Sequence, residues 1–293
     1  MLPQEILAQV RRLEIVTGRR VAESFAGDYL SVFKGRGMEF ASVREYTPGD
    51  EPRDIDRNVS ARAGKPFVRQ YIEERELTVV IAVDLSGSQE FGTADRLKRD
   101  AAVEVGAGLA LAALANNDKI GLALFTEGIE LFLPPRKGRR HALAAVREIL
   151  AYEPKKKGTN IGGSLSTLAS MLKRRGILIV VSDFRDKGFE RALKLCAVKH
   201  DLIPVVIEDP RESALPDAPA IVELFDPETG TRAALDLRGG AAALAREEQE
   251  RRAELARTFR SCGLDAATVS TDRPTLDPIV AFFHRRAKAR RTR

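Results

Sequence analysis

The segment Asp84-Leu85-Ser86-Gly87-Ser88 places one carboxylate and two hydroxyl groups directly after an apolar run, Leu77 to Val83. That run has the length and the β-branched content of a strand buried on both faces. Side chains at the carboxyl end of a central parallel strand lie where open α/β sheets bind ligands. Mg²⁺ prefers oxygen ligands in near-octahedral geometry. The segment therefore predicts part of a divalent-cation site.

Two later segments place further oxygen atoms after predicted strands or loops. Asp183 follows a second apolar run, Gly176 to Ser182, in the same order of strand and then acid. Thr159 lies in the loop from Lys157 to Ile161, just ahead of a helix-like stretch. Because the carboxyl ends of parallel strands meet at one edge of a sheet, we expect these loops to converge.

The order D-x-S-x-S, then Thr, then Asp resembles the metal-ion-dependent adhesion site of the von Willebrand factor type A fold. By that resemblance Asp84, Ser86, Ser88 and Thr159 are ligands of Mg²⁺ or Mn²⁺, and Asp183 acts through water. The resemblance also implies that an acidic side chain of a partner protein completes the coordination. The alternative is that these hydroxyl groups only cap helices and that Asp183 only closes a turn.

A block of motifs in residues 35–76 resembles the bacterial family called domain of unknown function 58. The block comprises Gly35 to Phe40, Val43 to Asp50, Arg53 to Asp56, Asn58 to Arg62 and Pro66 to Glu76. The closing Thr271 to Val280 resembles the end of that family. Arg57 stands where the family usually has Trp, and the chain contains no Trp. The resemblance implies an adaptor or accessory protein of a MoxR-type AAA+ ATPase, which binds the ATPase or its client.

The same block is dense in charges of both signs. One interpretation is an ion-pair network that clamps this extension onto the main domain, and the other is a partner-binding surface. The density of charge does not separate the two. The residues concerned are Arg44, Arg53, Arg57, Arg62 and Arg69, with Glu39, Glu45, Asp50, Asp54 and Asp56.

The rest of the chain alternates predicted strands and helices, which is typical of α/β proteins. Together with the resemblance, this predicts a Rossmann-like von Willebrand factor type A domain with a mostly parallel sheet flanked by helices. Pro204 favours a peripheral place for the strand at 202–207. Residues 219–237 read as an added β-hairpin around Pro227-Glu228-Thr229-Gly230. The predicted helices are 96–116, 139–151, 163–173, 188–200, 241–262 and one from 276 into the tail, and the other strands are 119–125, 129–133, 177–181 and 266–270.

Composition and resemblance place a domain boundary near residue 75. Residues 1–75 would hold an N-terminal helix, with apolar residues at helical spacing from Leu2 to Val16, and the charged block. Residues 76–293 would form the type A-like domain with a basic C-terminal helix. The apolar runs are too short to cross a bilayer, and charges at Glu5 and Arg11 interrupt any signal-peptide core. We therefore expect a cytoplasmic protein.

The net charge of +6 comes from the end of the chain. Residues 285–293 hold six bases and no acid, so the remainder has 48 − 6 = 42 bases against 42 acids. Such an end is commonly a solvated tail, and nucleic-acid binding through it is the lesser alternative. Lys155, Lys156 and Lys157 lead into the Thr159 loop, where their charge would steer an acidic partner; a solvated loop is the alternative.

Catalysis is disfavoured by what the motif lacks. Ser86 and Ser88 have no His or Lys partner within it, and a D-x-D phosphatase would need a second Asp where Ser86 stands. The phosphate-binding pattern G-x-x-x-x-G-K-[ST] does not occur. The sequence thus favours a non-enzymatic, metal-dependent protein–protein interaction module. The alternatives are a metal-dependent hydrolase of the phosphoesterase kind and a nucleic-acid binder.

Overall fold

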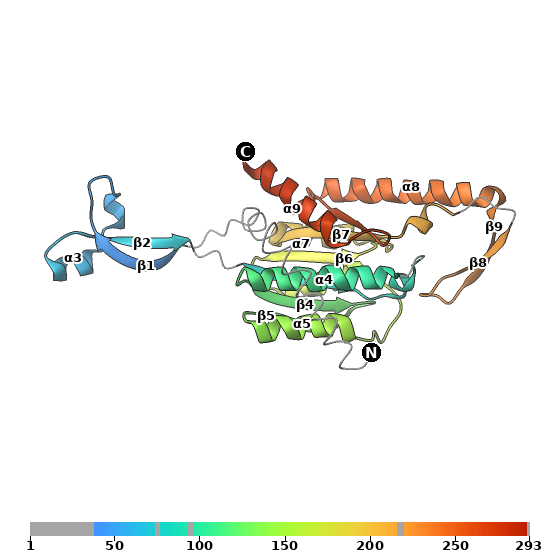
Figure 1. Ribbon diagram of the computed structural model, residues 1–293, viewed down its shortest axis with the longest axis horizontal. Helices are drawn as coiled ribbons and strands as arrows, with labels where there is room; N and C mark the ends of the chain where they lie inside the picture. Colours follow the sequence, from blue (N-terminus) through green and yellow to red (C-terminus); the bar gives the residue numbers. More distant parts are fainter. Residues whose placement is uncertain (1–37, 74–76, 93–95, 216–219, 292–293) are drawn as a thin grey trace. The chain divides into compact units, whose positions relative to one another are not determined.

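The structure is a computed structural model that describes residues 38–73, 77–92, 96–215 and 220–291 (Figure 1). The described residues fall into two compact units, one within Phe33–Leu77 and the other from Thr78 onwards. The N-terminal helix predicted from Leu2 to Val16 lies outside the described residues. So do the predicted domain boundary at residue 75 and the last two residues of the basic tail.

The small unit is built on two antiparallel strands, β1 (Met38–Glu45) and β2 (Phe67–Glu73). Between them lie a short 3₁₀ turn, η2 (Pro52–Asp54), and helix α3 (Arg57–Ala63). The side chain of Asp56 caps α3, because it accepts hydrogen bonds from the backbone N–H groups of Asn58 and Val59. Gly64 ends the helix with a left-handed φ of 69°. Arg57, at the position of the family's usual Trp, is exposed.

Several of the predicted charged residues pair within this unit. Arg44 holds Asp50 through two hydrogen bonds of 2.5 and 2.7 Å. Arg69 contacts Asp56 at 3.0 Å, and Lys65 contacts Glu45 at 3.1 Å. These contacts join the strands to the turn and to the helix cap, so the charges of the block contribute to its own fold.

The large unit contains a six-stranded sheet in the order β10-β7-β6-β3-β4-β5. Neighbouring strands are parallel, except that β5 runs antiparallel to β4. This is the mixed α/β fold with a mostly parallel sheet that the sequence predicts, and it is consistent with a Rossmann-like arrangement. The strands are β3 (Thr78–Asp84), β4 (Lys119–Phe125), β5 (Ile129–Arg136), β6 (Ile177–Ser182), β7 (Asp201–Glu208) and β10 (Ala267–Ser270).

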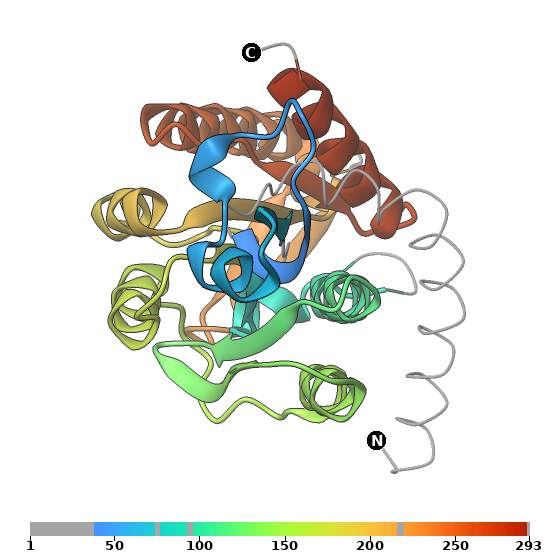
Figure 2. The ribbon, with the colours of Figure 1, turned by 90° about the vertical axis from the view of Figure 1, so that its left-hand side faces the viewer.

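Helices cover both faces of this sheet (Figure 2). On one face, α6, α7 and α8 enclose a core in which Phe184 contacts Phe189 and Phe259. On the other face, α4 packs against α5 and α9. The helices are α4 (Lys98–Ala115), α5 (Arg139–Ala151), α6 (Ile161–Met171), α7 (Glu190–Lys199), α8 (Leu237–Ser261) and α9 (Leu276–Arg291).

The predicted peripheral place of the strand at 202–207 is wrong. This strand, β7, pairs with β6 on one side and with β10 on the other. Pro204 lies one residue before the ladder with β10, which begins at Val205, so it takes no part in that pairing, and on its other side it is opposite Val180 of β6. The short strand β10 takes the edge position instead.

The predicted hairpin is present. Strands β8 (Ile221–Phe225) and β9 (Arg232–Asp236) form their own two-stranded antiparallel sheet. The hairpin leads straight into α8, whose first turn is capped by Asp236 through the N–H of Arg238. No helix of the described residues is long and apolar enough to cross a membrane.

Candidate metal site

Three of the predicted ligands meet at the carboxyl end of the central strand β3. Asp84 ends this strand and is 0 % exposed. One of its carboxylate oxygens accepts a 2.9 Å hydrogen bond from the backbone N–H of Ser86. The chain then turns into a 3₁₀ segment, η3 (Gly87–Glu90), which brings the hydroxyl oxygens of Ser86 and Ser88 to 3.1 Å from each other. One carboxylate and two hydroxyl groups thus lie together.

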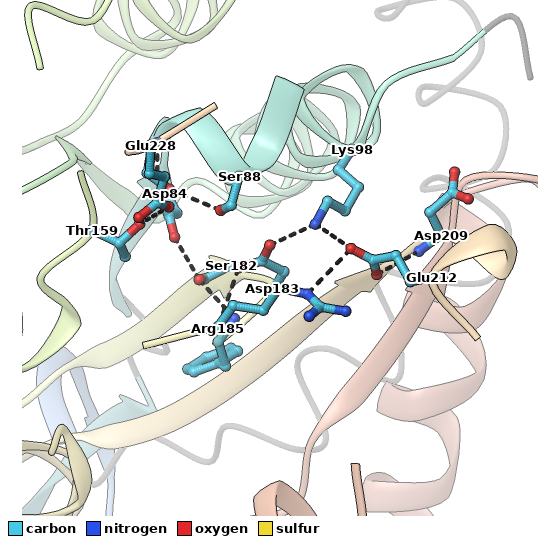
Figure 3. A network of polar contacts seen from close by, with 12 residues as sticks. Asp84, Ser88, Lys98, Thr159, Ser182, Asp183, Arg185, Asp209, Glu212 and Glu228 are labelled. Atoms are coloured by element: carbon cyan, nitrogen blue, oxygen red, sulfur yellow. Dashed lines mark hydrogen bonds and ion pairs between the residues drawn. The ribbon is translucent and has the colours of Figure 1, made fainter. Parts of the chain in front are cut away.

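Thr159 reaches the same place from the loop before α6. The N–H of Gly87 donates to the carbonyl of Lys157 at 2.7 Å, which ties this loop to the β3 end. Asn160 caps α6 through the N–H of Gly163. Figure 3 shows the hydroxyl of Thr159 directed at the carboxylate of Glu228. That hydrogen bond is 2.6 Å long.

Asp183 follows β6 and lies on the neighbouring strand end, but it faces a lysine (Figure 3). Its Oδ2 atom accepts a 2.6 Å hydrogen bond from the Nζ atom of Lys98, and both side chains are 1 % exposed. Lys98 also contacts Glu212 at 2.7 Å. The charge of Asp183 is therefore matched by a buried side-chain cation.

Asp84 has no ion-pair partner in the described part of the chain, where its polar contacts are hydrogen bonds. Besides Ser86, it accepts a 2.6 Å hydrogen bond from the hydroxyl of Ser182. Burial and the negative charge of Asp183 raise the pKa of Asp84 to about 7, although the bonds from Ser182 and Ser86 act in the opposite direction. A buried carboxylate without a counter-ion is costly. It is the condition that a bound cation would relieve.

The donor set fits a hard divalent cation that keeps open positions. It offers carboxylate and hydroxyl oxygens, which suit Mg²⁺ and Mn²⁺, and no thiol or imidazole. Among the described residues, no cluster of three or more His, Cys, Asp or Glu side chains forms a metal site. The fit therefore depends on the hydroxyl groups of Ser86, Ser88 and Thr159 together with Asp84.

A chain of ion pairs continues from Lys98 to helix α8. Arg185 contacts Glu212 at 3.2 Å and Glu248 at 2.7 Å. Glu248 lies on α8 and also holds Arg251 at 2.8 Å and Arg252 at 3.0 Å. Glu212 itself belongs to η4 (Pro210–Glu212), the 3₁₀ segment after β7. The network joins the ends of β6 and β7 to α8.

Four residues of this region are not predicted from the sequence: Ser182, Lys98, Glu212 and Glu228. A weak signal existed for Lys98, because Arg96, Lys98 and Arg99 are bases at the start of a helix, where the helix dipole disfavours cations. Such bases need an acidic partner from elsewhere. Ser182 directly precedes Asp183 at a strand end. No pattern in the sequence connects Glu228 with Thr159.

The three lysines before Thr159 are exposed, as a steering role requires. Their loop is held by Glu130, which accepts hydrogen bonds from the backbone N–H groups of Lys155 and Lys156 at 2.8 and 3.2 Å. The side chain of Lys156 contacts Glu127 at 2.9 Å. Part of the positive charge is therefore offset, and steering by Lys155 and Lys157 stays a prediction.

Comparison with known proteins shows a family match over most of the chain. The model of the family "Protein of unknown function DUF58" matches residues 42–258. Uncharacterized protein Rv1480 of Mycobacterium tuberculosis is 32% identical over 291 residues, which cover 97% of this chain and 90% of that protein. Uncharacterized protein MAV169 of Mycobacterium avium is 33% identical over 165 residues, 53% of this chain and 94% of that protein.

Among solved structures, the conserved hypothetical protein BatB from Bacteroides thetaiotaomicron is similar, with a TM-score of 0.48 and 18% identity. The match covers 72% of this chain and 99% of that one. An aerotolerance-related membrane protein from Bacteroides fragilis gives a TM-score of 0.41 and 18% identity over 58% of this chain and 88% of that one.

Lys98→Met is expected to lower the free energy of unfolding by about 3–5 kcal/mol, because it leaves Asp183 and Glu212 without their buried cation. Urea unfolding measures this loss. Lys194→Met, at an exposed position of α7, is the matched control and should change stability by no more than about 0.5 kcal/mol. Equal effects of the two substitutions would show that the Lys98 pair does not support the fold.

We expect the ion pairs of Glu248 to stabilise the folded protein at neutral pH and to lose this effect in acid. Burial raises its pKa, but the hydrogen bond from Arg251 and the charges of Arg185 and Arg251 outweigh this and lower the pKa from 4.5 to about 2. A lowered folded-state pKa stabilises the protein above pH 4.5, and the benefit is lost as the pH falls towards 2. The stability difference between wild type and Glu248→Gln should therefore shrink between pH 6 and pH 3 in urea titrations.

The neighbouring Glu247 is exposed and provides the control for this measurement. Glu247→Gln should leave the pH dependence of unfolding the same as in the wild type. A stability difference for Glu248→Gln that stays constant across the same pH range would contradict the ionised network.

Proposed function

The chain belongs to the family of proteins of unknown function DUF58, and from that premise we propose that it is a non-enzymatic module that binds a protein partner through a divalent cation. In this proposal its large unit is a von Willebrand factor type A-like domain. One observation carries the proposal: Asp84, a buried carboxylate with no counter-ion among the described residues, lies beside hydroxyl groups at the carboxyl end of the central strand. That edge is where such sheets bind ligands.

Each residue has a distinct part in the proposal. Asp84, Ser86, Ser88 and Thr159 would hold Mg²⁺ or Mn²⁺, and Asp183 would act through water. Because Lys98 matches the charge of Asp183, Asp84 alone offsets one of the two positive charges. A bound cation supplies a position that a carboxylate oxygen of the partner can take. Burial of Asp84 and Ser86 keeps bulk water away from this contact and strengthens it.

The proposed partner is a MoxR-type AAA+ ATPase or its client, met in the cytoplasm. Support comes from family membership, because the resemblance in residues 35–76 implies an accessory role of that kind. The exposed Lys155 and Lys157 suit an acidic partner surface. No specific observation favours the hydrolase, since the hydroxyl of Ser86 contacts that of Ser88 and the carboxylate of Asp84, which this proposal assigns to the cation. No specific observation favours nucleic-acid binding either, because Arg286 in the basic helix α9 pairs with Asp201.

Mg²⁺ or Mn²⁺ is expected to raise the melting temperature of the chelator-treated protein. A ligand that binds only the folded state adds about 2.7 kcal/mol at a hundredfold excess over its Kd. Asp84→Asn should abolish this shift and should raise the melting temperature of the metal-free protein, because the amide removes repulsion with Asp183. Differential scanning calorimetry measures both effects. Asp265→Asn, at an exposed position, is the control; a metal-induced shift that survives Asp84→Asn would exclude the site.

Binding to a candidate MoxR-type ATPase is expected to separate two classes of variant. Chelator or Ser86→Ala should speed dissociation, because both remove the desolvated contact through the cation. Lys155→Glu with Lys157→Glu should mainly slow association and alter its salt dependence. The measurement is surface-immobilised binding of the full chain with Mg²⁺ and with chelator.

Tight binding that is unchanged by chelator and by Ser86→Ala would contradict the metal-mediated contact. The partner would then dock elsewhere, and the charged block of residues 35–76 would be the first surface to test. Arg191→Glu with Lys194→Glu serves as a control for the lysine variant, because it makes the same change of charge at two exposed positions of α7.

A further inference from the structure

The turn of the β8–β9 hairpin brings an acidic side chain to the candidate metal site. Glu228 accepts the 2.6 Å hydrogen bond from Thr159 (Figure 3). The backbone of the turn also lies close to Gly87. A Cβ atom placed on Gly87 would be 3.0 Å from the carbonyl oxygen of Pro227 and 3.2 Å from the nitrogen of Glu228. The turn therefore packs directly on the D-x-S-x-S loop, and the absence of a side chain at Gly87 permits this approach.

The turn is internally braced, so that Glu228 is presented in a defined position. The carboxylate of Asp226 accepts the N–H of Glu228 at 2.9 Å and the hydroxyl of Thr229 at 2.7 Å. The N–H of Gly230 donates to the carbonyl of Asp226 at 2.8 Å, and Gly230 has a left-handed φ of 73°. Among the described residues, the hairpin strands pair only with each other. The turn thus connects an otherwise separate arm to the site.

Charge balance indicates what Glu228 does there. Asp183 is matched by Lys98, whereas neither Asp84 nor Glu228 has an ion-pair partner in the described part of the chain. When both are ionised, these two carboxylates carry two negative charges, which equals the charge of one divalent cation. A partly buried glutamate beside a fully buried aspartate would repel it if no cation lay between them.

We propose that Glu228 is an internal ligand of the cation bound at Asp84, and that the acidic side chain of a partner must displace it. This inference rests on the proposed function, because it needs the cation. Glu228 and a partner carboxylate then compete for one position. The hairpin keeps the site closed until a partner arrives, and the apparent affinity for the partner is reduced by the fraction of molecules in which Glu228 is bound.

The first test uses Mn²⁺ alone and the full chain after treatment with chelator. Glu228→Gln keeps the size of the side chain and an acceptor for Thr159 but removes the charge. It is expected to weaken Mn²⁺ binding by about tenfold or more, measured by calorimetry and by the electron paramagnetic resonance signal of free Mn²⁺. Glu223→Gln, an exposed position on the same hairpin, should stay within about twofold of wild type.

The second test adds acetate as a simple carboxylate probe to the Mn²⁺-saturated protein. Acetate that replaces water on the cation lowers the relaxation enhancement of water protons. With Glu228→Ala, which vacates the position, acetate should act at a concentration about tenfold lower than in wild type. Glu223→Ala should behave as wild type does.

The outcomes separate this inference from the proposed function. If Asp84→Asn abolishes Mn²⁺ binding while Glu228→Gln and Glu228→Ala match wild type in both tests, the metal site stands and the internal ligand is overturned. If wild type binds no Mn²⁺, or binds it equally well with Asp84→Asn, both are overturned. Weaker Mn²⁺ binding by Glu228→Gln together with easier entry of acetate in Glu228→Ala supports the internal ligand.

Discussion

Two carboxylates, Asp84 and Asp183, are buried at the carboxyl ends of adjacent parallel strands, and their mutual repulsion is the constraint to which the surrounding side chains respond. β3 and β6 are paired up to Val83 and Val181, so the acids that follow must lie close together. Burial makes both charges costly. Lys98 relieves Asp183, and Ser182 donates a hydrogen bond to Asp84. The remaining imbalance is concentrated on Asp84.

The response to this repulsion couples distant parts of the large unit. Lys98, at the start of α4, shares Glu212 with Arg185, and Arg185 continues to Glu248 on α8. Helix α8 begins at the end of the β8–β9 hairpin, whose turn returns to Thr159. The site is therefore bounded by two contacts of one continuous segment, residues 221–261. Because β9 ends at Asp236 and α8 begins at Leu237, no linker separates the hairpin from the helix.

The strand ends and the D-x-S-x-S motif could be predicted because they depend on local patterns. Apolar runs of strand length identify β3 and β6, and the residue that follows each run identifies the acid. Lys98 and Glu228 could not be placed in this way, since their contacts join residues 85 and 69 positions apart. Pro204 led to a wrong prediction for a related reason. The cost of a proline in a strand depends on how far the neighbouring strand extends, and the sequence of β7 does not reveal the length of β10.

The charged block of residues 35–76 does not divide simply into an ion-pair network or a binding surface. Asp50, Asp56 and Glu45 are paired with bases of the same unit. Arg53, Arg57 and Arg62 are exposed, and they form no ion pair with another described residue. Glu51 and Asp54 lie in the approach to α3 and also form no ion pair with a described residue, so the unpaired charge here is of both signs. The paired charges therefore hold the small unit together, while the remaining charges of the block contribute no ion pair to its described part.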